Sequence, residues 1–480
     1  MPLSTLAPEL IHLVLSLLDR QDVSRLSQTC KRLRSIALPQ VYRTLRWTWE
    51  VQKAHNLETV SPPMHLLLRS VTENPQLGDY VEHVQLQKNA DAFPPRTEDA
   101  LWAPCYSPKV APSGIGTVTQ WVEHFDLASP REIHPALQRV QPFYVASPDH
   151  WSEALRRGDI QAYFALTLAF FPKLCSLVLS TDRTTNSRFI GSLFTHAVGP
   201  VAKAPPFGKL PSYELLRDVR MEMASDGPVR FLDMYSVFYL PSLETLTIEL
   251  GSAKRFQWPS PSQNRLTLAS LTTLKLTYCE ATEDALERIL SSKPPLKELL
   301  YNYSAAEESE GEYFNLSTLS RALNYVYTTL ESLTLEIEVQ PDSDEVPVYS
   351  NGPFNGTIDS FHHFPHLTHL EIPFVMLTGW HHIPRHTRTL SSLLPHSLRY
   401  LCLTDDLADW ENYNWDRPKD WLERLHDLLA GGLLGLEKVQ LNLQIRGPRW
   451  SDDHQAELER LCVRYGVEGL FNRRDRYPST

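Results

Sequence analysis

The chain has 480 residues, 42% of them hydrophobic and 21% charged, which is the composition of a folded globular protein and not of a disordered one. Its 46 Lys and Arg residues against 57 Asp and Glu residues give a formal net charge of −11, which argues against binding of nucleic acid or of an anionic membrane surface. The longest apolar stretch, residues 162–171, is too short for a membrane-spanning helix, which needs about 20 residues.

The N-terminus and the cysteines indicate where the protein works. The first residues have neither a basic segment nor a small-residue cleavage site, so we expect no secretory signal and a location in the cytoplasm or the nucleus. The six cysteines are dispersed and form no CxxC pair, which predicts reduced thiols and neither a zinc ribbon nor a disulfide framework. We therefore expect protein partners, and neither a membrane nor a nucleic acid among them.

Residues 6–18 predict the first helix. Pro8 and Glu9 suit its first turn, because proline lacks only an amide that would stay unpaired there, and a carboxylate favours the positive end of the helix dipole. One stripe of this helix should be apolar, since helical spacing places together Leu10, Ile11, Val14, Leu15 and Leu18.

Two more short helices are expected before residue 45. Residues 19–22 form a polar break, in which Asp22 can cap a second helix that carries Val23 and Leu26 inward. Thr29 can open a third helix, whose inward residues are Cys30, Leu33 and Ile36. Three helices of this size hide little apolar surface from one another, so part of that surface should bind a partner.

These residues resemble the F-box, a family whose pattern has an LPxEL opening, a helix that ends near Leu-Asp, and a DLxxLSxxCK segment. The chain has LAPEL at residues 6–10, LSLLD at residues 15–19 and DVSRLSQTCKRLR at residues 22–34. It departs from the family pattern at Ala7, where the family has proline, and here the proline follows at Pro8. The alternative is that these are only the first amphipathic helices of a larger domain.

The resemblance implies a partner and a docking surface. F-box proteins are substrate receptors, so residues 1–45 would dock on the Skp adaptor of a cullin-based, SCF-type ubiquitin ligase. At the matching positions, the adaptor-facing or supporting residues would be Leu6, Pro8, Leu10, Ile11, Leu15, Val23, Leu26 and Leu33.

A short phrase, apolar-x-x-apolar-x-apolar, recurs beyond residue 49. Copies begin at Val81, Leu174, Leu243, Leu271, Leu296, Leu330, Leu367, Leu398 and Leu436. Each copy predicts a short strand whose leucines point inward, after which the chain returns as a helix or turn. The pattern resembles the leucine-rich repeats that follow many F-boxes, in a degenerate form similar to fungal-type F-box proteins. The expected fold is α/β, a short three-helix F-box followed by an irregular leucine-rich-repeat solenoid; the alternative is a conventional α/β domain with buried leucine-rich strands.

The patterns predict four regions. These are an F-box at residues 1–45; residues 46–165 with a linker helix, a first repeat-like strand and an irregular insertion; a repeat array at residues 166–466; and a tail at residues 467–480. The insertion is expected at residues 91–150, which carry no copy of the phrase. The acidic segments 304–312 and 340–357 are expected to be solvated loops.

In such an array, the residues between the leucines point to the concave face, which would recognise the substrate. Counted from each phrase, these residues are Thr245, Thr247, Thr273, Lys275, Ser332, Thr334, His369, Glu371, Tyr400, Lys438 and Gln440. The set is mixed and mostly polar, which suggests a protein or peptide partner; a merely solvated sheet face is the alternative.

Patterns for catalysis or metal binding are weak. Histidines cluster at His362, His363, His366, His369, His381, His382 and His386. An HxxH pair in a strand points its two rings to opposite faces, and neither an HExxH motif nor a cysteine set accompanies these histidines. Phosphate-binding, calcium-binding and GxSxG patterns are incomplete or absent from the sequence. We therefore expect no enzyme, no cofactor and no metal site; the alternatives are a non-ligase F-box scaffold and a histidine-based metal-dependent hydrolase.

Overall fold

The structure is a computed structural model that describes residues 5–49, 64–88, 151, 153–155, 159–180, 188–198, 210–222, 234–251, 266, 268–280, 282–306, 314–340, 354–355, 358–379, 389–407, 418–432, 435–444 and 450–474. The chain divides into two compact units. Unit 1 comprises Met1–Val229, Asp233–Leu243 and Pro259–Asn264, and unit 2 comprises Arg230–Leu232, Glu244–Trp258 and Arg265–Thr480. Both units combine helices with parallel strands, so the expected α/β class is confirmed.

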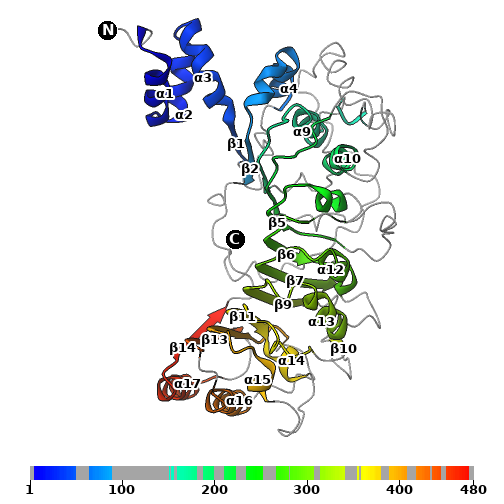
Figure 1. Ribbon diagram of the computed structural model, residues 1–480, viewed down its shortest axis with the longest axis vertical. Coiled ribbons are helices and arrows are strands. Elements are labelled where there is room, and N and C mark those ends of the chain that lie inside the picture. Colours follow the sequence, from blue (N-terminus) through cyan, green and yellow to red (C-terminus); the bar gives the residue numbers. More distant parts are fainter. Residues whose placement is uncertain are drawn as a thin grey trace, which may run out of the picture. The chain divides into compact units, whose positions relative to one another are not determined.

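Unit 1 begins with three helices, drawn in dark blue in Figure 1. They are α1 (Pro8–Leu17), α2 (Arg20–Ser27) and α3 (Lys31–Arg43). Three helices are expected here, but the residues at the starts of α2 and α3 differ from the prediction. Asp19, and not Asp22, caps α2, because the Asp19 carboxylate accepts the backbone amide of Asp22 at 2.8 Å. Cys30 and not Thr29 directly precedes α3, and the Thr29 hydroxyl donates to the Leu26 carbonyl at 2.8 Å.

The strands of unit 1 follow the order β1-β2-β3-β4, and neighbours are parallel. Its elements after α3 are β1 (Thr44–Trp49), α4 (Met64–Glu73), the 3-10 helix η2 (Pro75–Tyr80), β2 (His83–Lys88), α9 (Ile160–Leu168), β3 (Ser176–Ser180), α10 (Arg188–Ala197), β4 (Asp218–Glu222) and the 3-10 helix η5 (Tyr235–Tyr239). The strand register lines up the buried residues Leu45, Val84, Leu177 and Val219. These residues form part of the core of unit 1.

β1 is a strand that the repeat phrase does not predict. β1 begins directly at the end of α3, and the helix α4 follows it within residues 46–165, where a linker helix was expected. Its sequence, TLRWTW, consists largely of threonine and aromatic residues that favour strands, and each of its residues pairs with β2. The predicted insertion at residues 91–150 lies outside the described residues.

A close contact in unit 1 requires a glycine. Gly78 lies in η2 and is buried, and a Cβ atom at this position would collide with the carbonyl oxygen of Phe170. This oxygen belongs to the backbone just after α9, so it cannot turn away as a flexible side chain could. η2 can therefore approach this segment only because position 78 has no side chain.

We predict that Gly78→Ala lowers the free energy of unfolding by about 1–3 kcal/mol, because the backbone must shift to relieve the collision. Gln76→Ala changes an exposed residue of the same 3-10 helix and should alter this free energy by less than about 0.5 kcal/mol. Chemical denaturation followed by circular dichroism measures both changes. Equal stability of the two variants would contradict the described packing of η2 against Phe170.

The strands of unit 2 follow the order β5-β6-β7-β9-β11-β12-β13-β14, again with parallel neighbours. The strands are β5 (Thr245–Ile248), β6 (Thr273–Cys279), β7 (Glu298–Ala306), β9 (Ser332–Gln340), β11 (His369–Pro373), β12 (Tyr400–Thr404), β13 (Lys438–Gln444) and β14 (Glu468–Arg474). The helices are α12 (Glu283–Leu290), α13 (Leu316–Asn324), α14 (Phe374–Thr378), α15 (Leu390–Leu393), α16 (Pro418–Ala430) and α17 (Asp452–Arg464). A separate parallel pair joins β8 (Phe314–Asn315) and β10 (Phe354–Asn355).

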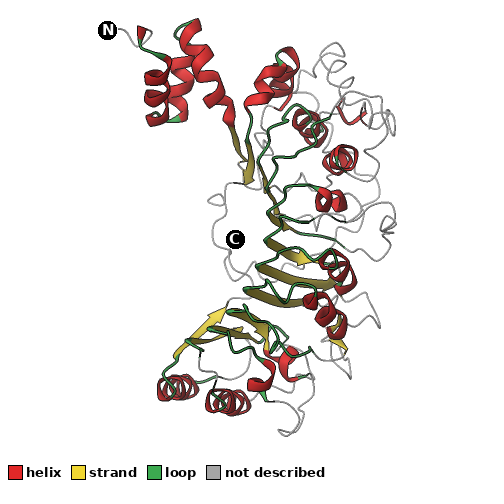
Figure 2. Ribbon diagram, viewed as in Figure 1, coloured by secondary structure: helices red, strands yellow, loops and turns green. Residues whose placement is uncertain are grey.

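The core of unit 2 contains a row of leucines that crosses the sheet. Six leucines and one valine lie in register on successive strands, and all of them are buried: Leu246, Leu274, Leu299, Leu333, Leu370, Leu401 and Val439. Figures 1 and 2 show α12 and α13 along one side of β6, β7 and β9. Because side chains alternate along a strand, the residues between the leucines lie on the opposite side, which we call the polar face.

Successive strands of unit 2 begin with the same backbone hydrogen bonds. The amides of Lys297 and Glu298 both donate to the carbonyl of Thr272, and the next residue pair repeats this arrangement on the carbonyl of Lys297. Further copies join residues 368 and 369 to 331, residues 399 and 400 to 368, and residues 437 and 438 to 399. This recurring contact fixes the register of the strands although the number of residues between them varies.

Three segments expected as loops or tail contain strands. Residues 304–306 extend β7, and residues 354–355 form β10, within the predicted acidic loops. Residues 468–474 form β14, although residues 467–480 were expected to be a tail. β14 pairs with β13 along its length, and α17 packs beside it, so this segment has a backbone partner that local sequence does not reveal.

Candidate functional site

The first helix has a buried side that joins the three N-terminal helices together. Ile11 and Leu15 of α1 are fully buried and pack with Val23 of α2 and with Leu33 and Ala37 of α3. Partly buried residues that pack around this cluster are Leu6, Leu18, Leu26, Ile36 and Val41. The apolar core of the helical domain is therefore small and already occupied by one side of α1.

The other side of α1 exposes three leucines to solvent. Leu10 is 50% exposed, Leu13 60% and Leu17 80%. They are separated by three and four residues, so they lie on one stripe of the helix, the leucine stripe. Isolated exposed leucines are common on proteins, but a continuous apolar stripe indicates a surface that binds another molecule.

Hydrogen bonds from α3 hold both ends of α1. The guanidinium of Arg32 donates to the carbonyl of Leu6 at 2.8 Å, and the side-chain amide of Gln40 donates to the carbonyl of Leu15 at 2.8 Å. The carbonyl of Leu15 lies in the last turn of α1 and also accepts the backbone amide of the C-cap residue Leu18 at 3.2 Å. These contacts keep the leucine stripe in one position relative to the other two helices.

The structure sorts the predicted adaptor-facing residues into three groups. Ile11, Leu15, Val23 and Leu33 are buried in the helical core and offer no contact surface. Leu6 and Leu26 are partly buried, whereas Pro8 and Leu10 are exposed. The sequence analysis missed Leu13 and Leu17, although their spacing from Leu10 places them on the same stripe.

The helical domain connects to the sheet of unit 1 without a flexible segment. The amide of Glu82 donates to the carbonyl of Arg43 at 2.9 Å, and the Arg43 guanidinium pairs with the Glu82 carboxylate at 2.8 Å. At the start of α2, burial lowers the pKa of Arg20 below its ordinary value, and the positive charge of Arg46 in β1 lowers it further. The two contacts between Arg43 and Glu82 therefore join the end of α3 to the residue just before β2.

The polar face of unit 2 collects the predicted substrate-binding residues into two rows. In the first row, Thr245, Thr273, Glu298, Ser332, His369, Tyr400, Lys438 and Glu468 lie in register. The second row holds Thr247, Lys275, Leu300, Thr334, Glu371, Cys402, Gln440 and Leu470. All the predicted residues thus share one face, but Thr247 is only 8% exposed and cannot offer much contact surface.

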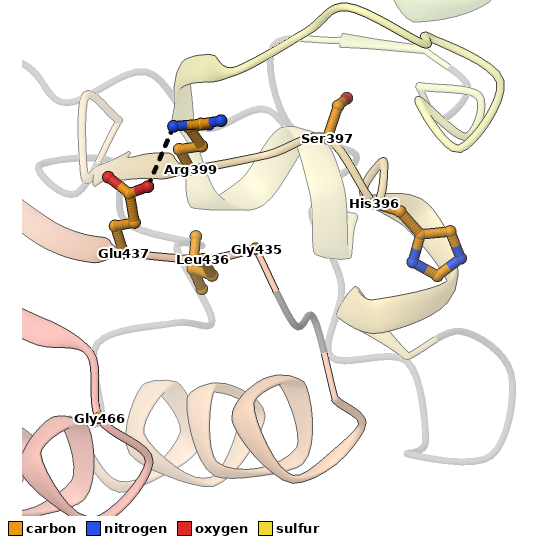
Figure 3. Close-up of a pocket in the computed structure, with 7 residues that line it drawn as sticks. All are labelled: His396, Ser397, Arg399, Gly435, Leu436, Glu437 and Gly466. Carbon is orange, nitrogen blue, oxygen red and sulfur yellow. Dashed lines mark hydrogen bonds and ion pairs between the residues drawn. The ribbon is translucent and has the colours of Figure 1, made fainter.

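A shallow pocket of about 490 Å³ lies at the amino ends of β12 and β13, where Figure 3 shows its lining residues. Arg399 and Glu437 form an ion pair of 3.2 Å across it, while the ring of His396 extends away from this pair. Both charged side chains are largely exposed, so the pair contributes little to stability. The hydroxyl of Ser397, which also lines the pocket, donates to the backbone carbonyls of Phe364 and Leu367.

Described members of the histidine cluster make local contacts. His363 Nε2 lies 2.7 Å from Asn324 Oδ1, and the rings of His362 and His396 meet edge to face with centroids 4.9 Å apart. His381, His382 and His386 lie outside the described residues. Among the residues that the structure does describe, no three His, Cys, Asp or Glu side chains are grouped so as to hold a metal ion.

Over the described part of the chain, no helix combines the length and the apolarity needed to cross a membrane.

Comparison with known proteins concerns the helical domain. No curated protein matches the chain. Residues 4–46 match the family model described as F-box-like. This range includes α1, α2, α3 and the leucine stripe. The protein therefore carries an F-box-like domain at its N-terminal end.

Proposed function

We propose that this protein is the substrate-recognition subunit of an SCF-type ubiquitin ligase. The F-box-like domain binds the Skp adaptor through the leucine stripe, and the adaptor links the chain to cullin. The observation that carries this proposal is the exposure of Leu10, Leu13 and Leu17 within the matched residues 4–46. F-box domains generally bind Skp-type adaptors, and an apolar stripe is a suitable contact for such a partner.

The leucine stripe can supply the main anchoring contacts. Full burial of a leucine side chain contributes about 1.5–3 kcal/mol of favourable free energy. Partial burial of three exposed leucines would therefore supply a substantial part of the binding free energy of a stable interface. Ala7 does not prevent this arrangement. Its carbonyl accepts the amides of Leu10 and Ile11 at 3.1 Å, so α1 begins directly after Ala7.

The parallel strands would present the substrate. We interpret them as a degenerate leucine-rich-repeat array, a reading supported by the row of buried leucines and by the recurring backbone contact at the start of each strand. The substrate would bind on the polar face. In this proposal the chain is not an enzyme, since an associated conjugating enzyme transfers ubiquitin while the receptor raises the local concentration of the substrate. The cytoplasm or the nucleus is the location that this role requires.

We predict that Leu13→Asp combined with Leu17→Asp weakens adaptor binding at least 100-fold, because two unpaired carboxylates would have to be buried in an apolar interface. Calorimetric titration of the full-length chain with purified Skp adaptor measures the affinity. The matched control, His12→Asp with Ser16→Asp, adds two aspartates to exposed positions of the same helix that flank the leucine stripe without replacing any of its leucines. It should change the affinity less than fivefold. Unchanged affinity of the folded Leu13/Leu17 variant would refute the docking surface.

The two sides of α1 should also separate stability from binding. Leu15→Ala removes a fully buried side chain and should lower the stability of the helical domain by about 2–5 kcal/mol. Leu13→Ala should lower it by less than about 0.5 kcal/mol and yet weaken adaptor binding. Hydrogen exchange of the α1 and α3 amides measures the local stability in the full-length chain. If Leu13→Ala destabilised the domain as much as Leu15→Ala, the assignment of the two sides would be wrong.

A further inference from the structure

The helical domain has the opposite charge to the chain as a whole. Residues 5–49 contain seven Lys or Arg residues and three Asp or Glu residues, a formal net charge of +4, whereas the whole chain carries −11. Two of the seven cations already face a carboxylate: Arg25 pairs with Asp22 at 3.1 Å, and Arg43 pairs with Glu82 at 2.8 Å. A positive region on a chain of negative net charge indicates a local role for that charge.

Three cations gather at the start of α3, and we call them the basic cluster. They are Lys31, Arg32 and Arg34, and all three are exposed. The guanidinium of Arg32 donates to the carbonyl of Leu6, which lies four residues before Leu10. The basic cluster is therefore next to the start of α1, at the end of the leucine stripe where Leu10 lies.

The basic cluster is unfavourable for the helix that carries it. The first turn of α3 contains no acidic residue, although the free amides at the start of a helix favour negative side chains and disfavour positive ones. Within the described part of the chain, neither Lys31 nor Arg34 forms an ion pair that would offset this cost. Charges that the local structure disfavours are expected where a contact with another molecule uses them.

We propose that the basic cluster attracts an acidic surface of the adaptor and accelerates association, while the leucine stripe determines how long the complex lasts. The inference rests on the proposed binding of the adaptor and adds the chemistry of the surface that meets α3, which must carry carboxylates. Charges at the rim of an interface act mainly on the association rate, and well-packed apolar contacts act mainly on the dissociation rate. The two neighbouring surfaces of the helical domain would thus control different rate constants.

Salt should separate the two contributions. Ions screen exposed charges over about 10 Å at 0.1 M ionic strength and over about 3 Å at 1 M, whereas burial of leucines does not depend on this screening. Between about 50 and 500 mM sodium chloride, the association rate constant of the full-length chain with purified Skp adaptor should fall at least tenfold. The dissociation rate constant should change less than threefold over the same range. Stopped-flow fluorescence with a labelled adaptor measures both constants.

Lys31→Glu combined with Arg34→Glu should lower the association rate constant at least tenfold at about 50 mM salt and change the dissociation rate constant less than threefold. The variant leaves Arg32 and its contact with Leu6 in place. It also puts a carboxylate into the first turn of α3, where the helix favours one, so weakened folding would not explain the loss. Circular dichroism confirms that the helices are retained.

The matched control, Lys173→Glu with Lys419→Glu, makes the same change of net charge at two exposed positions outside the helical domain. It should change the association rate constant less than twofold. An association rate that does not depend on salt, an equal loss in both double variants, or an effect on dissociation alone would overturn the inference. Adaptor binding with any of these results rejects the role of the basic cluster alone, whereas absence of adaptor binding in the unmodified chain rejects the receptor function.

Discussion

The alignment of buried leucines across parallel strands is the constraint on which the arrangement of unit 2 depends. Leu246, Leu274, Leu299 and their successors occupy equivalent positions, and each strand pairs with the next without a change of direction. Because a strand has a period of two, a shift of one residue would expose every one of these leucines. The same constraint places the polar residues between them on a single face, so the core determines which side chains can meet a partner.

In the helical domain, the corresponding constraint is the small size of the core. Ile11 and Leu15 fill the space against Val23, Leu33 and Ala37, which leaves no room for the leucines on the other side of α1. Three short helices cannot enclose both sides of an apolar helix. The exposed leucine stripe is therefore a consequence of the packing, and binding to an adaptor would complete the burial that the domain cannot provide by itself.

Sequence patterns predicted the elements better than the roles of single residues. Helical periodicity located three helices, and the repeat phrase located most strands, because both signals depend on burial that repeats along the chain. The division of α1 into a buried and an exposed side was not predictable, since Leu10, Ile11, Leu13 and Val14 are all apolar and surround much of the helix. Asp19 and Asp22 were equally plausible caps by residue type.

Other differences between the sequence-based expectations and the structure arose from contacts between distant segments of the chain. β1 and β14 became strands through pairing with β2 and β13, which a local pattern does not record. The repeat phrase also ends before the strands do, since β7 and β9 continue beyond its leucines and bring Asn302 and Glu336 together. Their contact joins residues 34 positions apart and required the strand register.

Hydrogen–deuterium exchange of the full-length chain, with and without purified Skp adaptor, tests the central claim most directly. The account predicts that the adaptor slows exchange in α1, where the leucine stripe lies, and leaves the strands of unit 2 unchanged. Binding of the adaptor with no change of exchange in α1, or with slower exchange only in unit 2, would contradict it.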